Sequence, residues 1–188
     1  MRRLGGAALA LLTVLASAAA TRAGSADVPA GDSAILVRPQ AREDTILVSF
    51  STDQAIAAGV ERAIQSGLPT TFTYDVELRR SSSFWFDKLI ASARIAVTVR
   101  YDTLTRRYHV TLLQDGRVAE ARATDQAEEV RRWVSVFHSL PLFPTRELRQ
   151  HTEYYVRVHG RTSPRNTWSF WPWTRPAARG SASFTFVP

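Results

Sequence analysis

Alternation of apolar and polar residues restricts the fold of this chain more than any other feature. In the segment TTFTYDVELRR the alternating apolar residues are Phe72, Tyr74, Val76 and Leu78. Further alternating runs occupy residues 46–50, 95–101, 108–112, 154–158 and 184–186. A period of two places apolar side chains on one face of a strand and polar ones on the other. The pattern therefore predicts half-buried strands of an antiparallel sheet with one face in water.

Turn and helix signals separate these strands. Asp115 and Gly116 form a dipeptide suited to a tight hairpin, and a short polar loop in YDTLTRRY predicts another. A first helix is predicted from Asp53, as N-cap, to the stop signals Gly67 and Pro69. A second is predicted from Asp125, as N-cap, to about Leu140, with a buried stripe of Val130, Trp133, Val134 and Phe137.

These elements do not follow a regular β-α alternation. We therefore expect an α+β fold, with six to eight strands in a mainly antiparallel, sandwich-like sheet and two helices packed on it. The chain has 188 residues, which suits one domain. We place that β-rich domain at residues 34–188, with a basic aromatic segment towards its C-terminal end.

The first residues predict export. The segment MRRLGGAALALLTVLASAAA has two arginines, an apolar run and small residues at its end, which is typical of a secretory signal peptide. We assign residues 1–24 to this peptide and residues 25–33 to a flexible leader. No later segment has the length of a transmembrane span, and the chain has no cysteine. A periplasmic or secreted bacterial protein, held by its core alone, is the expected form.

Charge narrows the expected partners. The formal charge is +7, and loss of three arginines with residues 1–24 leaves +4 for the exported chain. No acidic residue follows Glu153, so the C-terminal part is the basic end. An exported protein does not meet chromosomal DNA. An envelope protein or an anionic membrane surface is the expected partner, and nucleic acid is not.

Recognisable catalytic motifs are missing from the sequence. No glycine-rich phosphate loop, nucleophile elbow or metal-binding His-Glu-x-x-His helix occurs, and no two histidines have a ligand spacing. Asp75 and Glu77 lie two residues apart on the wet face of one strand. They form either cross-strand ion pairs with arginines or the two carboxylates of a glycoside hydrolase, and the ion pairs are favoured. We expect no catalytic residue, no cofactor and no metal.

A tryptophan-rich segment is the remaining unusual feature. NTWSFWPWTRP holds three tryptophans and a phenylalanine within six positions. Period-two alternation divides these rings between core cover and an exposed face. Tryptophan and arginine are common at binding surfaces, so the candidate contacts with a partner or lipid are Trp171, Trp173, Arg175 and Arg179.

Several segments together resemble a known family. They are SGLPTTFTYDVELRR, FWFD, VRYDTLTRRYHV, EEVRRW and LPLFP, which fall in the family's order between about Ile46 and Val158. The chain resembles the bacterial family called domain of unknown function 4390. The resemblance implies an exported protein of uncharacterised activity, with no catalytic residues to carry over. It also hints at signalling, because some members are encoded beside a nitrogen-type sensor kinase.

Three functions follow as hypotheses. The first is a non-catalytic accessory protein that binds a membrane protein, such as the sensory part of a kinase. The second is a carrier of an apolar or lipid ligand, which an apolar pocket of several hundred cubic ångströms would favour. The third is a hydrolase that uses Asp75 and Glu77, which carboxylates converging in a cleft would favour.

Overall fold

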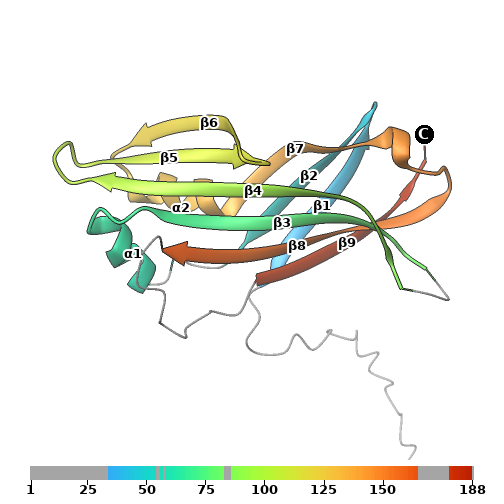
Figure 1. Ribbon diagram of the computed structural model, residues 1–188, viewed down its shortest axis with the longest axis horizontal. Helices are drawn as coiled ribbons and strands as arrows, with labels where there is room; N and C mark the ends of the chain where they lie inside the picture. The colour runs from blue at the N-terminus through green and yellow to red at the C-terminus, as the bar shows by residue number, and fades with distance from the viewer. Residues whose placement is uncertain (1–33, 54–55, 57, 83–85, 165–177, 188) are drawn as a thin grey trace, which may run out of the picture.

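The computed structural model describes residues 34–53, 56, 58–82, 86–164 and 178–187. The predicted signal peptide and leader lie outside these residues. Within them, nine strands form two antiparallel sheets (Figure 1). The larger sheet has the order β6-β5-β4-β3-β8-β9, and its strands are β3 (Thr70–Arg80), β4 (Lys88–Asp102), β5 (Arg107–Gln114), β6 (Arg117–Thr124), β8 (Thr152–Pro164) and β9 (Ala178–Phe186). The smaller sheet has the order β1-β2-β7, with β1 (Ile35–Arg42), β2 (Thr45–Thr52) and β7 (Val136–Pro144).

The core lies between the two sheets. The alternating apolar residues of β2, β3, β4 and β8 are buried, which confirms the predicted wet and dry faces. Phe50 of β2 stacks on Phe137 of β7 with ring centroids 4.4 Å apart, and Tyr74 of β3 completes this aromatic cluster. The sandwich-like α+β architecture is therefore confirmed for the part of the chain that the structure describes.

One side of the sandwich is closed by β1 and β9. A parallel bridge links Ala34 to Arg179, and β1 packs along β9. Gly180 permits this close approach, because a Cβ atom at that position would lie 1.9 Å from the carbonyl oxygen of Ile35. The opposite side is different: β6 and β7 are the outer strands of their sheets there, and α2 (Ala127–Ser135) connects them (Figure 1).

The second helix is shorter than the sequence predicts. It ends at Ser135, and the chain continues as β7 from Val136, so the predicted end near Leu140 is wrong. Phe137 fits the helical stripe by spacing, but it reaches the core from β7, where it pairs with Phe50. Pairing with β2 satisfies the backbone N–H and C=O groups of this segment, which would otherwise have to be satisfied within a longer helix. With β7 the described residues contain nine strands, more than the predicted six to eight.

The start of this helix also differs from the prediction. Gln126 is the N-cap and makes no capping side-chain bond; instead its N–H donates to the hydroxyl of Thr124 at 3.1 Å. Asp125 therefore does not cap the helix. Val130 and Val134 are buried as predicted, whereas Trp133 is only half-buried. The half-buried tryptophan borders a hollow between α2, β7 and the larger sheet.

The first helix, α1 (Ala58–Gln65), is likewise shorter than predicted. It begins after Asp53, so that residue does not cap it, while its predicted end is confirmed. Gly67 has a φ of 85°, and the N–H of Leu68 donates to the carbonyl of Ala63, a C-terminal capping arrangement that needs glycine. Arg131 of α2 bonds Glu61 of α1 at 2.9 Å, which links the two helices.

The predicted hairpin at Asp115 and Gly116 is confirmed. Both residues have positive φ angles, 50° and 81°, as a two-residue turn of this kind requires. The turn joins β5 to β6 and places β6 at the free edge of the larger sheet.

Candidate functional site

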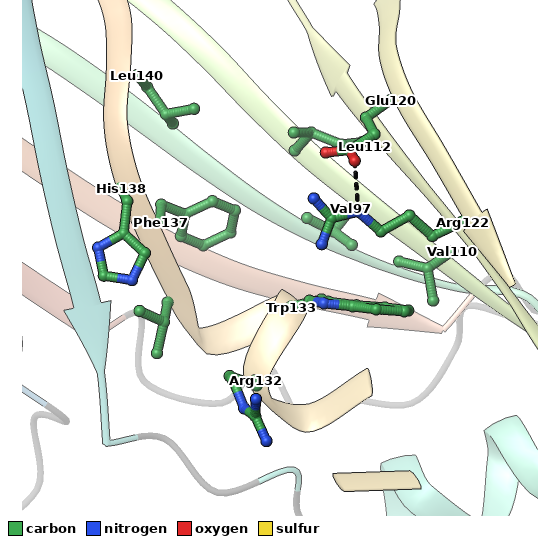
Figure 2. Close-up of a pocket in the computed structure, with 11 residues that line it drawn as sticks. Val97, Val110, Leu112, Glu120, Arg122, Arg132, Trp133, Phe137, His138 and Leu140 are labelled. Carbon is green, nitrogen blue, oxygen red and sulfur yellow. Dashed lines mark hydrogen bonds and ion pairs between the residues drawn. The ribbon is translucent and has the colours of Figure 1, made fainter. Parts of the chain in front are cut away.

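A pocket opens on the side of the sandwich where the two sheets separate. It lies between β4, β5 and β6 of the larger sheet and α2 and β7, and its volume is about 340 Å³. Figure 2 shows side chains from both sides converging on this space, with Phe137 and Leu140 on β7 facing Leu112 and Val110 on β5. The size is within the range of small-ligand sites.

The walls of the pocket are mainly apolar. Val97 and Val110 come from the buried face of the larger sheet, and Phe137 adds an aromatic ring from β7. Leu112, Val136 and Leu140 continue this surface. The period-two alternation that fills the core also places these apolar side chains on the walls of the pocket. The pocket is therefore an uncovered part of the core rather than a separate cavity.

The rim of the pocket is polar and predominantly basic. Arg122 donates from Nε to Oε1 of Glu120 at 2.5 Å, and its Cζ lies 5.1 Å from the ring centroid of Trp133. Figure 2 shows the Arg122 guanidinium between the Glu120 carboxylate and the Trp133 ring. Arg132 and His138 also line the pocket. The lining thus contains one carboxylate, two guanidinium groups and one imidazole, so its ionised side chains carry a net positive charge, which favours an anionic group.

Sequence reasoning missed this site. A signal was present in β6, where Glu120 and Arg122 stand opposite Leu112 and Val110 of β5. Cross-strand partners share a face, so charged residues in β6 lie on the face that is apolar in β5. Such a break in the pattern marks the place where the core opens to water. The register of β5 and β6 was needed to see it, because a bulge shifts the pairing between Leu112 and Leu113.

Asp75 and Glu77 lie on the outer face of the larger sheet, away from this pocket. Asp75 accepts from Nε of Arg94 at 2.8 Å and is also bonded by Arg161. Glu77 accepts from Arg79 at 2.9 Å and from Arg157 at 3.2 Å. Each carboxylate is thus held between two guanidinium groups, which confirms the cross-strand ion pairs predicted from the sequence.

An open hollow of about 790 Å³ surrounds these ion pairs. Asp115, Ser92 and His159 line it together with the two carboxylates. Partial burial lowers the pKa of His159, and the nearby charge of Arg157 lowers it further. The side chains of Asp75 and Glu77 are engaged by arginines, and Asp115 accepts from the backbone N–H of Arg94, so the arrangement gives little support to a pair of acid and base catalysts.

The predicted contact residues fall largely outside the described part of the chain. Trp171, Trp173 and Arg175 lie in residues 165–177, of which nothing is described. Arg179 is exposed on β9, opposite His159 of β8. It therefore shares the outer face with Arg94, Arg157 and Arg161.

Two further properties concern the described residues only. They include no group of three or more His, Asp or Glu side chains arranged to hold a metal ion. Within the same part of the chain, none of the helices combines the length and the apolar character required to cross a bilayer.

The fold and the pocket define a two-sheet antiparallel protein with an apolar site between its sheets. The family model described as a domain of unknown function (DUF4390) matches residues 35–166, well over half of the chain, and the chain belongs to this family. The match begins at β1 and ends beyond β8, which confirms the family seen in the sequence. No curated protein and no solved structure gives a significant match.

Proposed function

We propose that this protein is an exported, non-catalytic binding protein that holds a small amphipathic ligand in the pocket between its sheets. The pocket of about 340 Å³ with apolar walls carries the proposal. An apolar hollow of this size is costly to leave in water, because burial of apolar surface is favourable in proportion to its area. A ligand with an apolar body offsets that cost.

The rim suggests the chemistry of the ligand's polar end. Arg122 is engaged by Glu120 and Trp133, and Arg132 and His138 are two further basic residues of the lining. A carboxylate or phosphate group at the mouth would receive charge-assisted hydrogen bonds there. A fatty acid or a similar anionic amphiphile therefore fits both parts of the site.

A displacement experiment with a fluorescent fatty acid tests this function. The wild-type protein should bind the probe, and unlabelled fatty acid should displace it. Leu112→Trp fills the pocket from β5 and should weaken binding by about tenfold or more, since the added ring occupies the ligand's space. Leu104→Trp places the same side chain in an exposed turn and should bind as the wild type does.

The two variants also define the result that would overturn the proposal. If Leu112→Trp is folded, with a far-ultraviolet spectrum like that of wild type, and still binds the probe with unchanged affinity, the pocket is not the binding site. If the wild type binds no acyl probe at all, the carrier function fails.

A second function is favoured by the charge of the outer face. Arginines 79, 94, 157, 161 and 179 share this face with Asp75 and Glu77 of β3 and with the carboxylates of Asp115 and Glu153. The surplus of arginine on β8 and β9 suits docking on an acidic surface of an envelope protein, such as a membrane sensor kinase, or on an anionic membrane. Vesicles of phosphatidylglycerol test the membrane case. Arg179→Glu should reduce their capture of the protein at low salt, whereas Arg146→Glu, an exposed change in η1 (Thr145–Glu147), should reduce it less.

A further inference from the structure

Strand β6 is an open edge of the larger sheet. It pairs with β5 on one side, and no strand of the described residues pairs with its other side (Figure 1). Seven of its eight residues are exposed, and Val118 has 64% of its surface in water. An edge of this kind presents unpaired backbone N–H and C=O groups to any strand that fits.

The sequence of this edge is complementary to itself. When β6 is laid antiparallel against a second copy with Ala121 opposite Ala121, Glu120 stands opposite Arg122 and Ala119 opposite Ala123. A two-fold axis repeats the Glu120–Arg122 pair, so opposite charges meet at two places. Small alanine side chains fill the other face of the new ladder.

Neighbouring registers are much less favourable. A two-residue shift in one direction places Glu120 opposite Glu120, and the same shift in the other direction places Arg122 opposite Arg122. Like charges directly opposite each other destabilise a strand pair. The charges of β6 also discourage pairing with strands that do not complement them. The edge is thus selective for one partner, its own copy, in one register.

We infer that two copies of this protein associate through β6 in this register and form one continuous twelve-stranded sheet from two six-stranded ones. The association also concerns the pocket, because Glu120 and Arg122 stand at its rim. In the dimer each of these residues gains an oppositely charged neighbour from the partner copy. The two pockets then lie on either side of the shared seam.

Cysteine cross-linking provides the first test, because the chain contains no cysteine of its own. Ala121→Cys should form a disulfide-linked dimer under mild oxidation, since the two-fold axis brings residue 121 next to itself. Ala119→Cys should not, because its partner in this register is Ala123. The double variant A119C/A123C should cross-link again. Equal cross-linking of the A121C and A119C variants, or none by either A121C or the double variant, would overturn the inference.

Charge reversal provides the second test, read as the dimer dissociation constant in sedimentation equilibrium. Glu120→Arg or Arg122→Glu alone places like charges opposite each other twice, and each should weaken the dimer by about tenfold or more. The double variant E120R/R122E exchanges the charges and should recover affinity to within about threefold of wild type. Arg146→Glu, far from β6 in η1, should leave the dissociation constant unchanged.

The outcomes separate association from ligand binding. Cross-linking through residue 121 needs no ligand, so it is observed in the absence of fatty acid whether or not the pocket binds one. A purified protein that remains monomeric at high concentration and low salt contradicts the inference and leaves the proposed ligand site standing. A dimer in which the E120R/R122E variant is no tighter than its single parents also contradicts it.

Discussion

The guanidinium carbon of Arg122 lies 5.1 Å from the centre of the Trp133 ring, so the edge strand of one sheet and the helix that leads to the other meet above the pocket. This contact accounts for the half-buried position of Trp133. The Trp133 ring contacts the Arg122 guanidinium on one face and also borders the pocket, so the core cannot enclose it on all sides. The contact therefore links the stability of the helix to the shape of the site.

We expect Trp133→Ala to lower the free energy of unfolding by about 2 kcal/mol, less than the ~3–5 kcal/mol of a fully buried tryptophan. In a double-mutant cycle with Arg122→Ala, the coupling should be about 0.5–1 kcal/mol, the range of a partly exposed cation–π contact. Urea unfolding of the four proteins measures it. Purely additive effects would show that the two groups do not interact in solution.

Tyr74→Phe should lower the free energy of unfolding by about 1–2 kcal/mol at neutral pH. The Tyr74 hydroxyl donates to the carbonyl of Val134 at 2.5 Å within the core, and its removal leaves a buried acceptor unsatisfied. Tyr154→Phe tests a second buried hydroxyl, which accepts from the N–H of Arg149. A variant as stable as wild type would show that the hydroxyl of the replaced tyrosine makes no hydrogen bond that stabilises the folded protein.

Tyr74 should also make the protein sensitive to alkali. Burial raises the pKa of this tyrosine well above its ordinary value of 10.0. Above about pH 10 the unfolded chain loses the proton while the folded chain keeps it, so stability falls as the pH rises. Denaturant unfolding between pH 9 and 11.5 should show a shallower fall for Tyr74→Phe. Identical slopes for both proteins would contradict the assignment.

Two glycine-to-alanine changes should act in opposite directions. At Gly180 the new methyl group would collide with the Ile35 carbonyl, so Gly180→Ala should lower the free energy of unfolding by about 3 kcal/mol. Gly59 lies in α1 with no atom within 4 Å of the added group. Gly59→Ala should therefore raise stability, by up to about 1 kcal/mol. Thermal unfolding of both variants measures these changes. A Gly180→Ala variant as stable as wild type would contradict the close contact between β1 and β9.

Replacement of Glu77 by glutamine should cost about 1 kcal/mol at low salt, because the carboxylate joins Arg79 and Arg157 on a partly exposed face. The cost should shrink at high salt, where exposed charges are screened. Glu153→Gln changes an exposed carboxylate of β8 and serves as the control. An effect that does not depend on salt would mean that the role of Glu77 is not electrostatic.

The sequence was a good guide wherever a period of two continued over several residues. Buried residues such as Val76 and Val97 follow directly from that period, and the Asp115–Gly116 hairpin follows from its turn chemistry. The helix after Asp125 was harder to delimit, because Phe137 satisfies a helical spacing and also a strand that pairs with β2. Only the long-range pairing decides between the two, and a local pattern carries no information about it.

The pocket was beyond the reach of sequence reasoning for a related reason. It exists because β6 and β7 diverge, a property of how two sheets are placed rather than of any one segment. The ion pairs of Asp75 and Glu77 could be predicted from the sequence, because polar residues on the wet faces of adjacent strands lie opposite one another. The identity of the interacting arginines on β8 required the strand order.

The closure of β1 against β9 has a consequence for the order of events during synthesis. β1 is among the first parts of the domain to be made and β9 among the last, so their junction closes only when nearly all of the described chain exists. Contacts between distant parts of a chain form slowly, since the intervening loop must first be ordered. Until residues 178–186 emerge, the Gly180 contact is missing and one side of the core remains open to water. A partly made chain therefore exposes apolar core residues that the complete domain buries, and we expect it to aggregate more readily than the complete domain.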